Sequence, residues 1–400
     1  DPGFLSRAYP VHRGEQPGGI RSRGGPAGRP TPHSHEKARY MRRTPMLPLA
    51  ALLAAALLAA CAAPGARPAP EAAAGRPYLA DGDAHGYLSY DPTARVLRGF
   101  TRDGAQKWQR DDIDPYEAHC VRACPDAVVS TRPQGPGGTG GEVLWMLGGA
   151  RPTPPAEPTD VTVHWALSPT EWVGSTTGSI VVESGGRRRE TPLENGSTVV
   201  FRGSPDGTRG IVSNPAGTGP DVWVGHQVSL DAKEPAVGGA TPAMPGPAGC
   251  WTDDGTRIVT LGKGASAFAR DNPGTAPAGL AVDFVSECSA GPFGIAVVDY
   301  RPSPSGNTAK VSVFDPVTFR AMGSSGYLPQ ATGFRATGAC VAFSRDGKLT
   351  FMNPSDGTLH ATRNPALDIW PAGGDAAYVL EKANRVRVVP VSARDCPAAG

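Results

Sequence analysis

The 400-residue sequence has no apolar run long enough to cross a membrane as a helix. A transmembrane helix needs about 20 predominantly apolar residues, and the longest run, residues 46–60, is shorter. Long helical periodicity is also nearly absent, and 52 Gly and 42 Pro residues interrupt any helix of ordinary length. These absences argue against a membrane-spanning helical protein and against a helical bundle.

Motifs of several enzyme classes are missing as well. Gly262 and Lys263 have no glycine at the upstream distance that a phosphate-binding loop requires. Residues 323–326, Gly-Ser-Ser-Gly, lack the spacing of a Gly-x-Ser-x-Gly nucleophile elbow. Haem attachment is excluded because Cys-x-x-Cys-His does not occur. The sequence therefore disfavours nucleotide and serine-hydrolase chemistry, and it predicts no catalytic residue and no cofactor.

The formal charge of +2 is unevenly distributed along the chain. Residues 1–60 hold nine Lys or Arg against three Asp or Glu, and removing this surplus of +6 leaves −4 for residues 61–400. Such a domain lacks the clustered Lys and Arg by which proteins bind nucleic acid. The one basic run, residues 187–189, follows two glycines and is interpreted as a solvated loop after a hairpin turn.

The first 60 residues indicate an export signal. Residues 1–40 show no periodic apolar pattern and are interpreted as upstream sequence or a disordered leader. Residues 41–60 are interpreted as a signal peptide, because Arg42 and Arg43 precede an apolar core of suitable length. Two alternatives stay open: twin-arginine export, and an ordinary secretory signal or membrane anchor with an incidental cysteine.

The end of this apolar run resembles the lipobox of bacterial lipoproteins. Residues 58–61, Leu-Ala-Ala-Cys, place small residues directly before a cysteine. The resemblance implies cleavage before Cys61 and a lipid on its thiol, with palmitate among its fatty acids, which anchors the protein on the extracytoplasmic face of the cell membrane. Residues 61–75, rich in Ala and Pro, are interpreted as a tether. Residues 76–400 are then the exported domain.

Six further cysteines lie in the exported domain, and an even number in such a chain favours disulfides. Six cysteines allow fifteen connectivities. We expect the pairs nearest in sequence: Cys120–Cys124, Cys250–Cys288 and Cys340–Cys396. The alternative for Cys120 and Cys124 is a copper or zinc site beside His119, with a spacing similar to that of Sco-type copper-delivery proteins. A disulfide is favoured because the surrounding sequence predicts strands and contains no βαβ unit, which a Sco-type protein would have.

Short β-rich runs bounded by Gly and Pro predict an all-β domain. The runs are residues 143–147, 161–165, 179–183, 198–201, 222–224, 257–261, 294–298, 310–314 and 385–389. Asp-Gly pairs, which favour type I′ hairpins, begin at Asp103, Asp206, Asp254 and Asp346, with separations of 103, 48 and 92 residues. These separations are near multiples of about 48 residues. The domain of about 320 residues is therefore predicted to be a β-propeller of six to seven four-stranded blades, with tandem β-sandwiches as the alternative.

Several segments resemble propeller families. Residues 204–209 and 343–349 resemble the Ser-x-Asp-Gly hairpins of WD40-like and TolB-like propellers. Residues 311–316 are similar to the Val-x-Val-x-Asp strand of YVTN-type blades, and residues 103–108 to a blade ending of PQQ-like propellers. The Trp-Asp pair of a true WD40 array does not occur. The resemblance thus implies the propeller architecture and no single family.

Candidate ligand side chains are dispersed along the exported domain. Its five histidines form no His-x-His or His-Glu-x-x-His pair and are interpreted as surface or core residues: His85, His119, His164, His226 and His360. The acidic residues near positions 81–83 and 111–114 do not continue into a twelve-residue calcium loop and are interpreted as solvated turns. We predict no metal site, and we expect most of the seven tryptophans to wedge between adjacent sheets.

The expected function is that of a lipid-anchored binding or scaffolding module, because a propeller presents loops from every blade around one axis. The expected partners are envelope proteins, peptides or glycans, and not nucleic acid. The competing hypothesis is a propeller enzyme, such as a quinoprotein dehydrogenase, lactonase or glycan lyase, with side chains that converge at the axis. A third possibility is a sensor for a neighbouring kinase or transporter.

Overall fold

The computed structural model contains an all-β domain, and no helix in the part of the chain that it describes is long and apolar enough to cross a membrane. The predicted signal peptide, Cys61 and most of the predicted tether lie outside the described residues. The Asp206-Gly207 turn also lies outside them. The structure describes residues 75–131, 141–148, 161–176, 178–193, 199–203, 209–216, 222–229, 236–241, 243–269, 278–304, 306–382 and 385–396.

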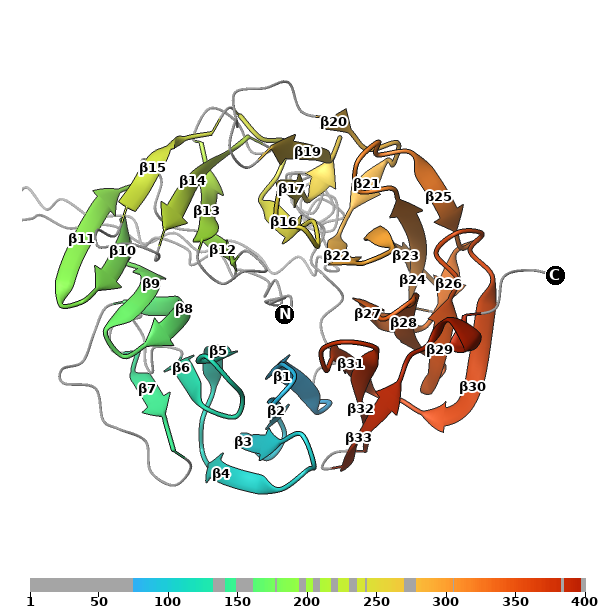
Figure 1. Cartoon of the computed structure of the whole chain (residues 1–400), viewed down its shortest axis with the longest axis horizontal. Coiled ribbons are helices and arrows are strands. Elements are labelled where there is room, and N and C mark those ends of the chain that lie inside the picture. Colours follow the sequence, from blue (N-terminus) through green and yellow to red (C-terminus); the bar gives the residue numbers. More distant parts are fainter. Residues whose placement is uncertain are drawn as a thin grey trace, which may run out of the picture. The chain divides into compact units, whose positions relative to one another are not determined.

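Eight antiparallel sheets surround one axis as the blades of a β-propeller (Figure 1). Within each blade, strands that follow one another in sequence lie side by side, and the first strand is innermost. The innermost strands of neighbouring blades contact each other, and the first strand of the domain contacts the innermost strand of the last blade. The ring is therefore closed by packing between its two ends.

The first half of the ring contains one blade with three strands and three blades with four. Blade 1 has β1 (Tyr78–Gly82), β2 (Gly86–Asp91), β3 (Val96–Thr101) and β4 (Gln106–Arg110). Blade 2 has β5 (Pro115–Cys120), β6 (Ala127–Thr131) and β7 (Val143–Met146). Blade 3 has β8 (Thr162–Ser168), β9 (Glu171–Ser175), β10 (Ser179–Ser184) and β11 (Arg187–Pro192). Blade 4 has β12 (Val200–Gly203), β13 (Arg209–Pro215), β14 (Trp223–Ser229) and β15 (Ala236–Ala240).

The second half ends on a blade with three strands and a short 3-10 turn, η2 (Ala393–Asp395). Blade 5 has β16 (Ala248–Trp251), β17 (Arg257–Thr260), β19 (Ser266–Ala269) and β20 (Ala278–Gly279), and β18 (Gly262–Lys263) pairs with β21 (Phe284–Val285) beside it. Blade 6 has β22 (Glu287–Gly291), β23 (Gly294–Ser303), β24 (Gly306–Phe314), β25 (Ala321–Ser324) and β26 (Leu328–Pro329). Blade 7 has β27 (Ala331–Thr337), β28 (Cys340–Arg345), β29 (Lys348–Met352) and β30 (Leu359–Pro365). Blade 8 has β31 (Asp368–Pro371), β32 (Ala376–Lys382) and β33 (Arg385–Pro390).

The propeller architecture is confirmed, but the predicted number of six to seven blades is wrong. The innermost strands begin at residues 78, 115, 162, 200, 248, 287, 331 and 368, so successive blades start 37 to 48 residues apart. The Asp-Gly turns do not mark this repeat, because they join different strands in different blades. Asp103-Gly104 joins β3 to β4, whereas Asp346-Gly347 joins β28 to β29. Their spacing therefore overestimates the length of a blade.

Among the three of these Asp-Gly turns that the structure describes, the hairpin between β28 and β29 is the one with positive φ at both residues. Asp346 has φ 51° and Gly347 has φ 70°, as a type I′ turn requires. Gly104 and Gly255 have positive φ, but the aspartates before them do not. An Asp-Gly pair thus predicts a turn more reliably than it predicts the turn type.

Burial decreases from the axis to the outer edge of a blade. In blade 3, Ile180, Val181 and Val182 of β10 are fully buried, whereas the Arg residues of β11 are exposed. The predicted loop at residues 187–189 is therefore wrong: the turn is Gly185-Gly186, and the arginines begin an outer strand. An edge strand with charged side chains resists pairing with another chain.

Side-chain oxygens connect neighbouring blades at several boundaries. In each case the oxygen accepts a hydrogen bond from a backbone N–H of the innermost strand of the next blade, which would otherwise be a buried donor without a partner. The pairs of acceptor and donor are Asp81 with Cys120 (2.7 Å), Ser130 with Val163 (2.9 Å), Ser213 with Ala248 (3.1 Å), Ser289 with Ala336 (2.8 Å) and Asp368 with Leu79 (2.8 Å). These contacts set the register between sheets.

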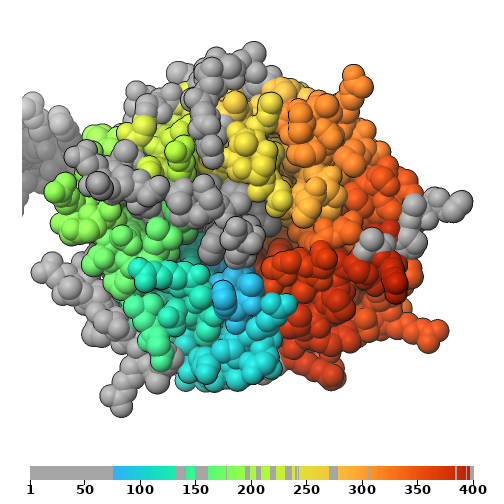
Figure 2. Space-filling view, viewed as in Figure 1, coloured from blue at the N-terminus to red at the C-terminus, as the bar shows by residue number. Residues whose placement is uncertain are grey.

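Aromatic side chains close the ring between blade 8 and blade 1, which lie side by side in Figure 2. The Trp370 indole donates a hydrogen bond to the carbonyl of Gly82 (3.0 Å), and the Tyr378 hydroxyl donates to the carbonyl of Asp83 (2.8 Å). Tyr378 also packs on Tyr87, with ring centroids 4.8 Å apart. A tryptophan between adjacent sheets, as predicted, is thus part of the closure.

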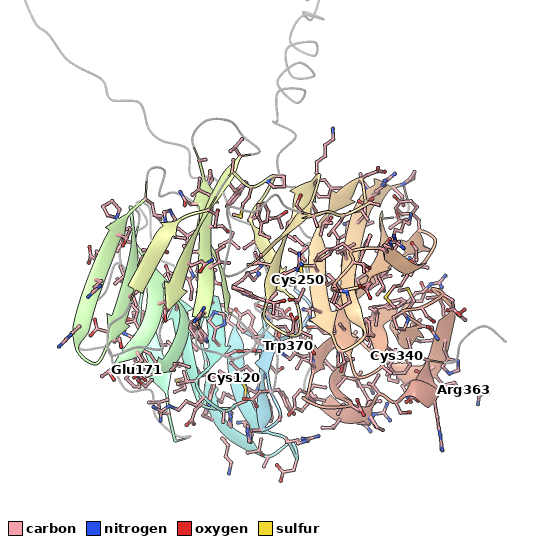
Figure 3. The ribbon with its side chains drawn as sticks, turned by 45° about the horizontal axis from the view of Figure 1, so that its top comes forward. Cys120, Glu171, Cys250, Cys340, Arg363 and Trp370 are labelled. Carbon is pink, nitrogen blue, oxygen red and sulfur yellow. A yellow bond between two sulfur atoms is a disulfide. The ribbon has the colours of Figure 1, made fainter. Side chains whose placement is uncertain are left out.

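Three disulfides connect the cysteines in the pairs expected from the sequence. Cys120–Cys124 lies within blade 2, Cys250–Cys288 joins the innermost strands of blades 5 and 6, and Cys340–Cys396 joins blade 7 to the segment after β33. Figure 3 shows Cys250 nearer the middle of the ring than Arg363. Disulfides persist in oxidising compartments, so they indicate a location outside the cytoplasm.

Candidate functional site

A carboxylate shared by two histidines lies on the innermost strands of blades 2 and 3. Glu117 and His119 are two residues apart on β5, so both side chains extend from the same face of the strand. Glu117 Oε2 lies 2.9 Å from His119 Nε2 and 3.0 Å from Nδ1 of His164 on β8. The three side chains are 15%, 10% and 2% exposed, respectively. We call this set, together with Ser175, the axial cluster.

Ser175 extends the cluster into the second strand of blade 3. It is the last residue of β9, and its Oγ lies 2.7 Å from His164 Nε2. His164 lies where the register between β8 and β9 shifts, so one extra residue of β8 is accommodated there. The Phe201 ring of blade 4 stacks on the imidazole, with centroids 6.4 Å apart and an interplanar angle of 17°. The imidazole is thus held between a carboxylate, a hydroxyl and an aromatic ring.

Electrostatics keep the Glu117 carboxylate ionised. Burial opposes its charge, but His164 and His119 outweigh this effect and lower the pKa of Glu117 to about 2. Burial likewise opposes the charge of His119, yet its hydrogen bond to Glu117 raises the His119 pKa above the ordinary value. Near neutral pH, Glu117 is therefore a hydrogen-bond acceptor only.

A second carboxylate pairs with arginine on another part of the inner ring. Glu287 of β22 contacts Arg335 Nη1 of β27, and the Arg335 guanidinium lies over the Trp370 ring, 4.8 Å from its centroid. Between the two carboxylates, Arg202 of β12 donates to the carbonyl of Gly249 (2.6 Å). Burial lowers the pKa of Arg202 to about 10, although Glu117 and Glu287 both oppose this shift. Arg202 therefore stays charged at neutral pH.

The structure places the other predicted candidates differently. Among the described residues, no group of three His, Cys, Asp or Glu side chains is arranged to hold a metal ion. The alternative of a copper or zinc site at Cys120 and Cys124 is not supported, because the two sulfurs form a disulfide. Asp81 and Asp83 are not solvated turn residues, since they are 4% and 1% exposed.

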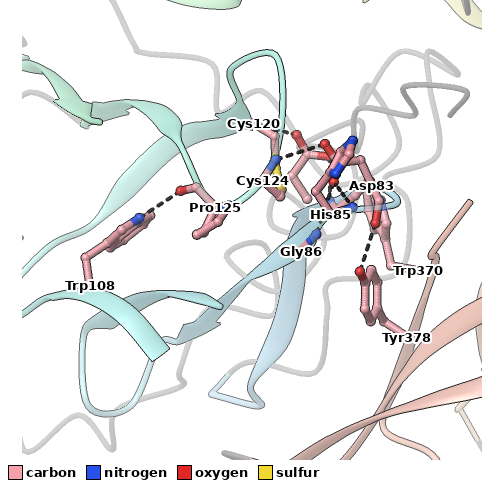
Figure 4. The surroundings of a disulfide bond; sticks show 11 residues. Asp83, His85, Gly86, Trp108, Cys120, Cys124, Pro125, Trp370 and Tyr378 are labelled. Carbon is pink, nitrogen blue, oxygen red and sulfur yellow. Dashed lines mark hydrogen bonds between the residues drawn. A yellow bond between two sulfur atoms is a disulfide. The ribbon is translucent and has the colours of Figure 1, made fainter. Parts of the chain in front are cut away.

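These two aspartates hold the disulfide loop of blade 2. The carboxylate of Asp81 accepts the Cys120 N–H. The carboxylate of Asp83 accepts the Cys124 N–H at 2.9 Å (Figure 4). Burial raises the pKa of Asp81 to about 6, and the nearby charge of His119 limits this rise. The Trp108 indole donates to the Pro125 carbonyl at 2.7 Å on the other side of the loop. Glu117 and His119 therefore lie on a strand, β5, whose last residue is held by a disulfide and by a hydrogen bond to blade 1.

The axial cluster was not predicted from the sequence. The Glu117-x-His119 spacing on a strand was a usable signal, because such residues share one face. No sequence signal connected them to His164 or Ser175, since the contact arises only where blades 2 and 3 meet. Of the five histidines, His85 and His360 are exposed, as surface residues should be.

No family model matches this sequence, and no curated protein matches it. Solved structures share its general architecture. AztD from Citrobacter koseri in its apo form aligns over 79% of this chain and 94% of its own, with 13% identity and a TM-score of 0.46. Hydrazine synthase of Kuenenia stuttgartiensis aligns over 70% of this chain and 97% of its own, with 10% identity and a TM-score of 0.44. Hsv2 of Kluyveromyces lactis aligns over 72% and 98%, with 9% identity and a TM-score of 0.44.

Similarity at this level carries no argument about activity. The strand order and the ring closure of this chain itself define the eight-bladed propeller.

Proposed function

We propose that the chain is a lipid-anchored propeller on the extracytoplasmic face of the cell membrane, where it binds an envelope protein or peptide. The three disulfides support the compartment. The lipobox resemblance at Cys61 supports the anchor, since two fatty chains hold a protein stably on a bilayer. The closed ring supports a binding role, because a propeller offers a rigid scaffold with many loops.

One observation supports the partner class: the large hydrophobic side chains that are exposed among the described residues all lie on the outer part of blade 6. They are Val317 (70% exposed), Met322 (39%) and Tyr327 (41%). Met322 lies on β25 and Tyr327 directly precedes β26, and both of these strands pair with β24. We call these three residues the blade 6 edge. Exposed large apolar side chains that all belong to one blade favour a protein interaction surface on that blade.

Tyr327 is held in one orientation. Its hydroxyl donates to Asp299 Oδ2 at 3.0 Å, and the Arg301 guanidinium lies 4.7 Å from its ring centroid. Arg301 Nε also donates to Asp299 Oδ2 at 2.9 Å. A tyrosine that is ordered before binding loses little conformational entropy on association. Tyr, Arg and Met are also enriched at protein interfaces, which favours a protein or peptide over a glycan.

The binding proposal is tested by site-specific photo-crosslinking in intact cells. A photoreactive amino acid replaces Met322 in one variant and His360 in a control variant, because His360 is exposed on the outer strand β30 of the adjacent blade. We expect a discrete crosslinked band at position 322 that is lost when Tyr327→Ser is added, and no such band at position 360. Equal crosslinking at both positions, or none at 322, contradicts the proposal.

The anchor is tested separately by metabolic labelling. The full chain is expressed with labelled palmitate, and we expect incorporation that Cys61→Ser abolishes. Cys120→Ser is the matched control, since it removes a cysteine of the exported domain and leaves the lipobox intact. Label that persists in Cys61→Ser, or no label in the wild type, excludes a lipid anchor at this residue.

A further inference from the structure

Three residues of the axial cluster have the arrangement of a nucleophile, a general base and an orienting carboxylate. Ser175 Oγ, the two nitrogens of His164 and Glu117 Oε2 form one continuous chain, with distances of 2.7 and 3.0 Å. We propose that Ser175 is a nucleophile that attacks small carboxylic esters, with His164 as general base and Glu117 as the residue that orients it. This activity goes beyond binding at the blade 6 edge and does not depend on it.

The hydrogen bonds assign the imidazole tautomer. Because Glu117 is ionised and can only accept, His164 Nδ1 carries the proton that lies between them. In the neutral imidazole, Nε2 then has a free lone pair, and it is directed at Ser175 Oγ. The serine hydroxyl donates to it. This is the tautomer that a general base needs in order to take a proton from serine.

The surroundings support the same role. His119 provides a second hydrogen bond to Glu117 Oε2 and acts as a positioning residue. The positive charge of Arg202 interacts favourably with the Glu117 carboxylate and opposes protonation of His119. Ser175 is 7% exposed and Phe201 packs on His164, so a small acyl group is the expected substrate portion. The 15% exposure of the Glu117 side chain shows that solvent reaches the cluster.

The reaction balances without a cofactor. Ser175 Oγ forms a bond to the ester carbonyl carbon while its proton moves to His164 Nε2. The bond from this carbon to the leaving oxygen then breaks, and that oxygen takes the proton from His164 to leave as an alcohol. Water, deprotonated by His164, hydrolyses the acyl-serine to a carboxylic acid and restores the hydroxyl.

The test is covalent labelling of the full chain in detergent with a fluorophosphonate, followed by peptide mass spectrometry. We expect an adduct on Ser175, and a decrease in labelling rate of about 100-fold or more in Ser175→Ala and in Glu117→Gln. Ser184→Ala is the matched control, because Ser184 lies in the same blade with 8% exposure and should leave the rate unchanged. Hydrolysis of p-nitrophenyl acetate should show a burst that Ser175→Ala removes.

A second variant keeps the test decisive if Ser175→Ala does not fold. His164→Gln retains the serine and removes the base, and we expect the fraction of this variant that forms the three disulfides to lose labelling. The proposal is overturned if folded wild type is not labelled, if the adduct is on another residue, or if His164→Gln is labelled at the wild-type rate. Any of these results would mean that Ser175 is only a hydrogen-bond partner of the buried His164 imidazole.

Discussion

Two carboxylates of the inner ring, Glu117 and Glu287, differ in the cations that neutralise them. Glu117 contacts two imidazoles, whereas Glu287 contacts the Arg335 guanidinium, which also lies over Trp370. A guanidinium keeps its proton at any physiological pH. An imidazole exchanges its proton near neutral pH. The Glu287 pair is therefore suited to structure alone, and the Glu117 group is also suited to proton transfer.

The two carboxylates also differ in how their strands are held. Each lies on an innermost strand that carries a cysteine: Cys120 on β5 and Cys288 on β22. The Cys120–Cys124 disulfide closes a short loop within one blade, while Cys250–Cys288 joins two blades. One disulfide therefore stabilises the ring across two blades, and the other stabilises a loop of a single blade beside the axial cluster.

The largest expected effect is on the arginine pair. Arg335→Met removes the cation that neutralises Glu287; the two side chains are 5% and 25% exposed, and breaking a largely buried ion pair from one side costs about 3–5 kcal/mol of the free energy of unfolding. Denaturant unfolding at pH 7 measures this loss. The double variant Glu287→Met/Arg335→Met should recover most of it, because no unpaired charge remains. A single variant as stable as the wild type contradicts a structural role for this pair.

The second largest expected effect is the loss of stability when each disulfide is removed. Cys250→Ser/Cys288→Ser opens a loop with a sequence separation of 38, and Cys120→Ser/Cys124→Ser opens one of 4. Loop-closure entropy gives losses of about 4 and about 2 kcal/mol, respectively. Thermal unfolding of the two double variants measures which of them loses more stability. Equal losses, or a larger loss in blade 2, would show that the link across blades has no special importance.

A third prediction concerns acid stability. The folded-state pKa of Glu117 is lowered from 4.5 to about 2, so its charge stabilises the fold above pH 4.5, and this stability is lost as the pH falls towards 2. Linkage gives roughly 3 kcal/mol for a shift of this size. Glu117→Gln should be less stable than the wild type at pH 7 by about this amount, and the difference should disappear near pH 2. A difference that does not change with pH would contradict the ionised state of Glu117.

The smallest expected effect concerns an exposed ion pair, and it tests whether burial is what makes the Glu287–Arg335 pair important for stability. Arg188 and Glu190 form an ion pair on the outer strand β11, with side chains 44% and 47% exposed. An exposed pair of this kind contributes about 0.5 kcal/mol or less. Arg188→Ser should therefore leave the free energy of unfolding nearly unchanged when measured beside Arg335→Met. A loss of similar size in both variants would remove burial as the explanation.

Much of the architecture could be predicted from local sequence patterns. Alternating and continuous apolar runs such as residues 179–183 and 310–314 predicted strands that occur as β10 and within β24. Neighbouring cysteines predicted the three disulfides, because residues on one blade or on adjacent blades are near in sequence. The blade number was wrong because turn residues record where the chain reverses, and not which strand of a blade precedes the reversal.

The sequence by itself indicated the all-β class and the sulfur pairs, because each of these depends on residues close together in the chain, whereas the export signal stays a prediction. Only the tertiary structure decided that Glu117, His164 and Ser175 meet, and that Glu287 meets Arg335. The physical reason is ring closure: eight sheets around one axis bring side chains of successive innermost strands together, at distances that no local pattern encodes.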